Sequence, residues 1–131
     1  MPQNAADTRI SLTIRWVLVM LYCGYLFFLS SLPGSDTPPP FPHFDKIMHF
    51  ALYAVLGALV LNALLLQAPA IGFGKRILLA AVLCALYGVT DEIHQHFVPT
   101  RNMDALDMAA NALGSAFGAF AAHRFASRKA R

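Results

Sequence analysis

Four apolar segments, each close to membrane length, constrain this chain more than any other feature. They extend from about residue 14 to 32, 47 to 66, 77 to 97 and 105 to 122, and the last two reach that length only with their polar ends included. A helix needs about 20 residues to cross a bilayer, with about 17 to 25 tolerated. No alternating β-barrel pattern is present, so helices remain the way to satisfy the backbone in lipid. We predict an all-α membrane protein, a compact bundle of four transmembrane helices in a single domain over residues 1–131.

The composition supports this class. Hydrophobic residues make up 57% of the chain and charged residues 13%, whereas soluble domains carry about a quarter charged residues. The two cysteines, Cys23 and Cys84, lie inside apolar segments without metal or CxxC spacing, so we expect them to act as small hydrophobic residues. The end of the first segment, Ser30-Ser31-Leu32-Pro33, is a poor signal-peptidase site, so we expect that segment to be retained.

The charged residues are sorted between the two sides of the predicted membrane. Eight of the ten Lys and Arg residues lie near the N-terminus, around Lys75-Arg76, or in the tail from Arg124. Six of the seven acidic residues lie in the other two connections. Because Lys and Arg mark cytoplasmic segments, we expect both termini in the cytoplasm and residues 33–46 and 91–107 on the outer side. The net charge of +3 does not indicate a nucleic-acid partner, since the basic residues flank apolar segments.

Polar side chains gather at the outward ends of the second, third and fourth segments. Asp45, His49 and Tyr53 follow one another at four-residue steps, which places them near one face of a helix. An ionised carboxylate at the bilayer centre costs about 3 kcal/mol on insertion scales, so these groups should face one another, with the two nearby cations as counter-ions. The predicted outward-facing polar pocket contains Asp45, Lys46, His49, Tyr53, Asp91, Glu92, Gln95, Arg101, Asp107 and Asn111.

Several residues also have a purely structural interpretation. His49 could bond a neighbouring helix or serve as a ligand or base, and Asp107 and Asn111 could hold helices together. Asp104 is expected to cap the fourth helix. The remaining structural expectations are a close-packing face at Gly114-x-x-x-Gly118 and solvated loop positions at Asp36 and His43.

Three motifs follow one another along the chain. They are Asp45-Lys46-x-x-His49-Phe50-x-x-Tyr53-x-x-x-Gly57, Asp91-Glu92-x-x-Gln95-x-Phe97, and Pro99-x-Arg101-x-x-x-x-x-Asp107-x-x-x-Asn111-x-x-Gly114-x-x-x-Gly118. Together they resemble the VanZ-like family of small bacterial membrane proteins. The resemblance implies a compact multi-pass protein of the bacterial inner membrane and cell envelope. It also implies a link, through the founding member, to resistance against the glycopeptide teicoplanin, but it supplies no established biochemical activity.

Two functions are consistent with such a site. In the first, the protein binds an amphiphilic envelope molecule such as a membrane lipid, a lipid-linked precursor or a lipoglycopeptide. Arg101 and Lys46 would hold its anionic group, and Tyr53, Gln95 and Asn111 would add hydrogen bonds.

In the second, the protein is an intramembrane hydrolase or transferase acting on a lipid phosphate. Asp91 or Glu92 would be the base, His49 a proton carrier and Arg101 the phosphate clamp. The cofactor is unknown; a divalent cation on these acids is one option, although no HExxH motif is present. A proton-conducting role is disfavoured because the polar residues stop about halfway along the second and fourth segments. Whether the protein is an enzyme, and its oligomeric state, stay open.

Overall fold

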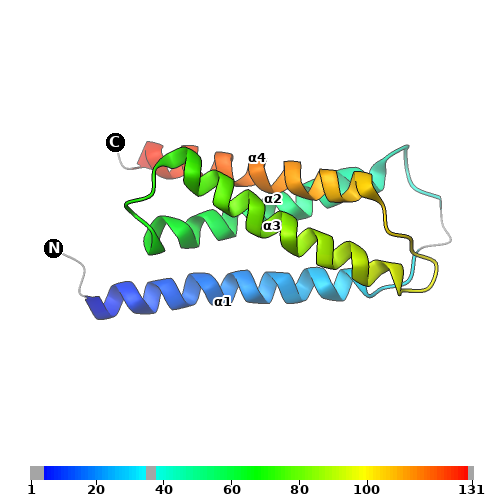
Figure 1. Ribbon diagram of the computed structural model, residues 1–131, viewed down its shortest axis with the longest axis horizontal. Coiled ribbons are helices and arrows are strands. Elements are labelled where there is room, and N and C mark those ends of the chain that lie inside the picture. The colour runs from blue at the N-terminus through cyan, green and yellow to red at the C-terminus, as the bar shows by residue number, and fades with distance from the viewer. Residues whose placement is uncertain (1–4, 35–37, 130–131) are drawn as a thin grey trace.

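The computed structural model describes residues 5–34 and 38–129, and these form four long helices that alternate in direction (Figure 1). The helices are α1 (Ala5–Ser30), α2 (Phe44–Gln67), α3 (Phe73–His96) and α4 (Ala105–Lys129). α1 begins and α4 ends at the same end of the bundle. The described ranges contain no strand. The predicted all-α helical bundle is therefore confirmed.

All four helices extend at one or both ends beyond the apolar segments from which they were predicted. α1 begins at Ala5, and α4 continues to Lys129. Hydropathy reports only the part of a helix suited to lipid, whereas the backbone hydrogen-bonding pattern continues through polar residues until a breaker intervenes. α1 ends shortly before Pro33-Gly34, and α2 begins shortly after Pro42.

Three helices in the described part of the chain are long and apolar enough to cross a membrane, namely α1, α2 and α3. α4 is not among them because its inward face carries Asp107, Asn111 and Ser115, which are all buried. Between residues 105 and 122 its large exposed residues, by contrast, are apolar and include Leu113 and Phe117. A helix that is polar inside and apolar outside suits a lipid surround, so we retain the prediction that α4 crosses as well.

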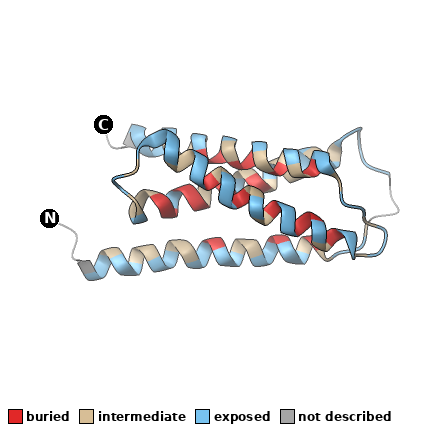
Figure 2. Cartoon of the chain, viewed as in Figure 1, coloured by how far each residue is buried: buried red, intermediate tan, exposed pale blue. Residues whose placement is uncertain are grey.

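The bundle as a whole also has apolar side chains on its surface and polar side chains in its interior. Figure 2 shows buried positions confined to the inward faces of the helices. Much of the exposed surface is made of large hydrophobic side chains, including Met20, Leu21 and Leu78. The buried residues, in turn, include charged and amide side chains such as Glu92 and Asn111. This distribution matches a protein whose outer surface contacts lipid and whose polar groups are shielded inside.

α2 and α4 form the most extensive helix pair, and glycine makes their close approach feasible. A Cβ atom on Gly114 would overlap the carbonyl group of Phe50, and one on Gly118 would overlap that of Ala54. On the other helix, a Cβ on Gly57 would overlap the backbone of Ser115. The glycine face predicted from the Gly-x-x-x-Gly spacing is therefore a close-packing surface.

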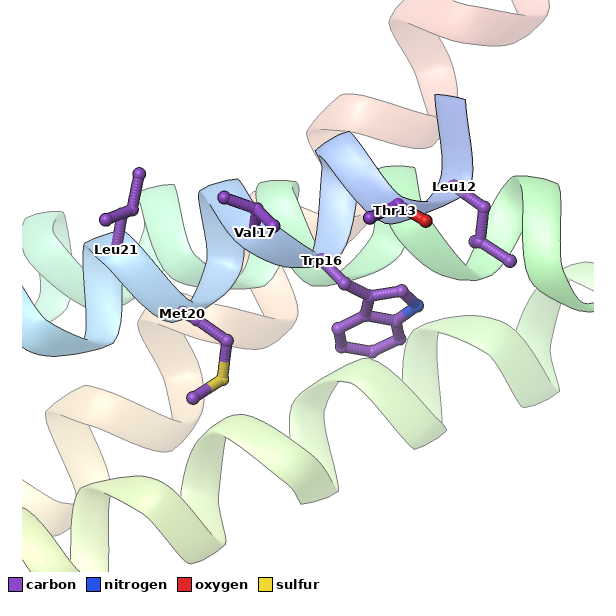
Figure 3. Close-up of a pocket in the computed structure, with 6 residues that line it drawn as sticks. All are labelled: Leu12, Thr13, Trp16, Val17, Met20 and Leu21. Atoms are coloured by element: carbon purple, nitrogen blue, oxygen red, sulfur yellow. The ribbon is translucent and has the colours of Figure 1, made fainter. Parts of the chain in front are cut away.

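α1 lies at the edge of the bundle, where it packs against α2 and α3 and not against α4. Several hydrogen bonds join it to these two helices. The Trp16 indole N–H donates to Gln67 Oε1 at 2.7 Å, and the Tyr22 hydroxyl donates to the Leu52 carbonyl at 3.0 Å. A shallow, mostly apolar hollow of about 500 Å³ lies along α1 beside Trp16 and Met20 (Figure 3). Its lining offers no cluster of ionisable groups, so the polar site lies elsewhere.

Candidate functional site

A cavity of about 510 Å³ lies at the end of the bundle where α1 and α3 finish and α2 and α4 begin. One of its walls is apolar and combines α1 with one face of α2, through Leu26, Leu29, Met48 and Leu52. The other wall is polar. It is formed by seven of the predicted site residues, Asp45, His49, Tyr53, Asp91, Gln95, Arg101 and Asp107. The cavity thus has the two-sided character that an amphiphilic molecule requires.

The three remaining predicted residues lie directly behind that polar wall. Lys46 contacts Asp107, and both Glu92 and Asn111 contact His49. All ten predicted site residues are therefore brought into one connected region, although they come from α2, α3, α4 and the connection before α4.

Lys46 is the centre of an ion-pair cluster. Its Nζ lies 2.8 Å from Asp45 Oδ2, 2.5 Å from Asp104 Oδ2 and 2.9 Å from Asp107 Oδ1. Asp104 also accepts the Leu106 backbone N–H at 2.8 Å, so it caps α4 as predicted. The Lys46 hydrogen bond, with help from this N–H, holds the pKa of the Asp104 carboxyl below its usual value. Lys46 is thus engaged with three carboxylates.

His49 joins α2 to both of the helices that face it. Its Nδ1 lies 3.0 Å from Asn111 Oδ1 on α4. Because a carbonyl oxygen only accepts, Nδ1 carries the proton in this contact. Carboxylates approach both ring nitrogens, with Glu92 Oε1 3.6 Å from Nδ1 and Asp107 Oδ2 3.8 Å from Nε2. His49 therefore makes the predicted hydrogen bond to a neighbouring helix, and its two carboxylate neighbours are also consistent with a role as ligand or base.

Two neighbouring carboxylates on α3, Asp91 and Glu92, are buried, and each has one oxygen without a hydrogen-bond partner. Glu92 is 0% exposed; its Oε2 accepts the Asp104 N–H at 3.2 Å, while its Oε1 has no hydrogen-bond partner. Asp91 Oδ2 accepts the Tyr53 hydroxyl at 3.2 Å, and its Oδ1 also lacks a partner. Burying a polar atom without a hydrogen bond costs about 1–3 kcal/mol in proteins, so unpaired carboxylate oxygens of this kind mark a candidate for function.

Arg101 differs from Lys46 because it contacts only neutral acceptors. Its Nη1 donates to Gln95 Oε1 at 3.1 Å, and its Nε donates to the Leu32 carbonyl at 3.1 Å. Within residues 5–34 and 38–129 it forms no ion pair. Arg101 therefore presents a positive charge, held by two neutral bonds, to the cavity that it lines.

The sequence did not indicate every residue at the site. Asp104 was expected to act only as a cap, yet it also pairs with Lys46 and bonds Glu92. The apolar wall was not foreseen either, although Met48 and Leu52 lie three residues after Asp45 and His49 on the same helical face. The α1 wall gave no signal beyond hydrophobicity.

Of the two expected loop residues, the structure describes only His43, and it does not line the cavity. His43 is exposed and precedes α2 with a left-handed φ of 62°. Asp36 lies outside the described residues.

A helical bundle in which three helices are long and apolar enough to cross a membrane defines an integral membrane protein, and this one carries a cluster of buried carboxylates at one end. The chain belongs to the VanZ/LLP1 family, whose model matches residues 6–126. This agrees with the resemblance seen in the motifs and extends it to the first helix. Neither the comparison with curated proteins nor that with solved structures finds a match.

Proposed function

We propose that this protein is a multi-pass cell-envelope protein of the bacterial inner membrane that binds the anionic group of an amphiphile in the cavity. The observation that carries the proposal is Arg101, a cation without a carboxylate partner in the described chain, at a cavity with one apolar and one polar wall. The amphiphile would be a membrane lipid, a lipid-linked envelope precursor or a lipoglycopeptide.

The chemistry of the cavity supports this class of ligand. Its volume of about 510 Å³ lies within the range of about 300–1,000 Å³ typical of small-molecule sites. The planar guanidinium of Arg101 matches a phosphate or carboxylate in a bidentate arrangement, and the α1 wall would contact an acyl or other apolar part. Lys46 is not available for this role because three carboxylates surround it. The anion-binding role therefore falls to Arg101, with Gln95 beside it.

The sidedness of the cavity supports a ligand from the envelope. It lies at the end of the bundle opposite to the start of α1 and the end of α4. The distribution of Lys and Arg favours cytoplasmic termini, which would turn the cavity toward the outer side. The teicoplanin link of the family's founding member makes lipoglycopeptides and their envelope targets reasonable first ligands to test.

Native mass spectrometry of the detergent-released protein tests the proposal. We expect an anionic amphiphile to co-purify with the parent, and Arg101→Gln to lower its occupancy by about tenfold, since a hydrogen bond to a charged group contributes about 1.5–3 kcal/mol. Arg124→Gln is the matched control because it removes the same charge from an exposed position near the other end of the bundle. Equal occupancy in the two variants would refute the assignment to Arg101.

An enzymatic function is the second candidate, and the unpaired oxygens of Asp91 and Glu92 favour it. A carboxylate without a partner beside His49 is suited to general acid–base catalysis on a lipid phosphate. Incubation with labelled phospholipid or isoprenoid phosphate would reveal turnover that Glu92→Gln abolishes. Turnover unchanged by that substitution would exclude Glu92 as the base.

A further inference from the structure

We propose that His49, Glu92 and Asp107 form a binding site for one divalent transition-metal ion, with zinc as the first candidate. Each residue offers one ligand atom, and the three atoms lie within 4.8 Å of one another. The site is distinct from the Arg101 contact, so it stands or falls independently of the amphiphile.

Both carboxylates are oriented for this role. Glu92 uses Oε2 to accept the Asp104 N–H, and its Oε1 is buried, without a hydrogen-bond partner, and 3.6 Å from His49 Nδ1. Asp107 places Oδ1 against Lys46 and leaves Oδ2 3.8 Å from His49 Nε2. In each case one oxygen is fixed by the protein while the other faces the imidazole. A bound cation would give this buried carboxylate oxygen the partner that it lacks.

The histidine is held as metal-binding histidines usually are. Its Nδ1–H donates to Asn111 Oδ1 at 3.0 Å, which fixes the tautomer and leaves Nε2 with a free lone pair toward Asp107. A carbonyl partner on the second ring nitrogen is the common outer-shell support of a metal-bound histidine. Asn111 therefore acts as a positioning residue.

The local charge also favours a cation. Among the residues that the structure describes, the connected cluster holds five carboxylates, Asp45, Asp91, Glu92, Asp104 and Asp107, and two permanent cations, Lys46 and Arg101. Arg101 pairs with none of the five. Full ionisation of these acids would leave a net negative charge at the site, and three of the five, Asp91, Glu92 and Asp107, are buried, where an uncompensated charge is costly. A divalent ion would offset most of it.

The donor set selects the kind of metal. One imidazole nitrogen with carboxylate oxygens suits zinc, manganese or cobalt, and neither cysteine belongs to the group. Zinc binds nitrogen and oxygen at about 2.0–2.2 Å, so its ligand atoms lie roughly 3.3–3.6 Å apart. The present spacing of up to 4.8 Å exceeds this by about 1.2–1.5 Å, which side-chain rotations would close. Three protein ligands leave a coordination position open, as in catalytic zinc sites, and His49 and Asp107 both line the cavity.

Titration of chelator-treated protein in detergent with Zn²⁺, followed by calorimetry, tests the site. We expect one equivalent to bind, and His49→Gln and Glu92→Gln each to weaken binding at least tenfold. Asp7→Asn is the matched control because it removes a carboxylate from an exposed position in the first turn of α1, at the other end of the bundle. Zinc binding that all three substitutions leave unchanged, or a parent protein that binds no zinc, would overturn the proposal.

X-ray absorption of the zinc-loaded parent gives a readout that does not depend on any variant folding. We expect one imidazole and oxygen ligands in the first shell. A shell containing sulfur would assign the metal to Cys23 or Cys84 and would also overturn the proposal. Asn111→Ala should weaken zinc binding by about 10- to 100-fold while keeping the same first-shell ligands, because it removes orientation rather than a ligand.

Discussion

Gly118 on α4 offers a demanding test of the packing that builds the site. A Cβ atom at this position would overlap the carbonyl oxygen and carbon of Ala54 on α2. These are backbone atoms of a neighbouring helix, so no flexible side chain can move aside. Gly118→Ala must therefore separate α2 from α4 locally.

The expected loss of stability follows from that geometry. Overpacking a close-packed interior costs about 1–3 kcal/mol, and a contact with helix backbone belongs at the upper end of this range. The higher helix propensity of alanine offsets at most about 1 kcal/mol of this loss. We expect Gly118→Ala to destabilise the protein by about 2 kcal/mol, which corresponds to a roughly 30-fold change in the unfolding equilibrium.

Gly24→Ala is the matched control, because a Cβ on Gly24 of α1 would meet no atom within 4 Å. We expect it to be neutral or slightly stabilising, by up to about 1 kcal/mol. Reversible denaturation in mixed micelles, followed by circular dichroism, would compare both variants with the parent. Equal stability of the two variants would refute the close approach of α2 and α4.

Three further perturbations probe the site and the topology. Lys46→Gln should lower the stability at neutral pH and make it fall less steeply in acid. Lys46 lowers the pKa of Asp104 in the folded state, so its stabilising contribution is present above the usual Asp range and is lost as the pH falls through the lowered pKa. Denaturation measured from pH 7 to 3 tests this, and a pH profile equal to that of the parent would contradict it. Tyr53→Phe should cost about 1–3 kcal/mol in the same assay, since it leaves Asp91 without the hydroxyl that its Oδ2 accepts; no loss would mean that this bond is absent. Fusion of fluorescent protein and of alkaline phosphatase after Arg131 should give fluorescence without phosphatase activity, and the reverse result would place the C-terminus outside.

Much of the fold was accessible from the sequence because hydropathy and helix length are tightly linked in membranes. The alternation of apolar segments with short connections predicted four helices, and the structure contains them. The limits of each helix were less accessible. α1 continues nine residues N-terminal to about residue 14, and Asp7 and Arg9 within that extension carry charge but still support helical hydrogen bonds.

The site was predicted from helical spacing, and the individual contacts were not. Four-residue steps placed Asp45, His49 and Tyr53 on one face, and all three line the cavity. Spacing could not show that Lys46 would be enclosed by three carboxylates while Arg101 would meet none. Those partners depend on how α4 is placed against α2, which is a long-range property.

The glycines and the polar residues of these motifs serve one physical requirement. Helices with ordinary side chains between them pack about 8–10 Å apart, whereas small residues allow a closer approach. Gly114 lies three residues after Asn111 on α4. It packs against the carbonyl of Phe50 on α2, the residue that directly follows His49. The 3.0 Å bond between His49 and Asn111 crosses the same interface one turn away, and so does the 2.9 Å contact of Lys46 with Asp107. The short side chains of Asn111 and Asp107 can reach α2 only because the glycines bring the backbones together, so the packing face sets the distances on which the proposed metal site depends.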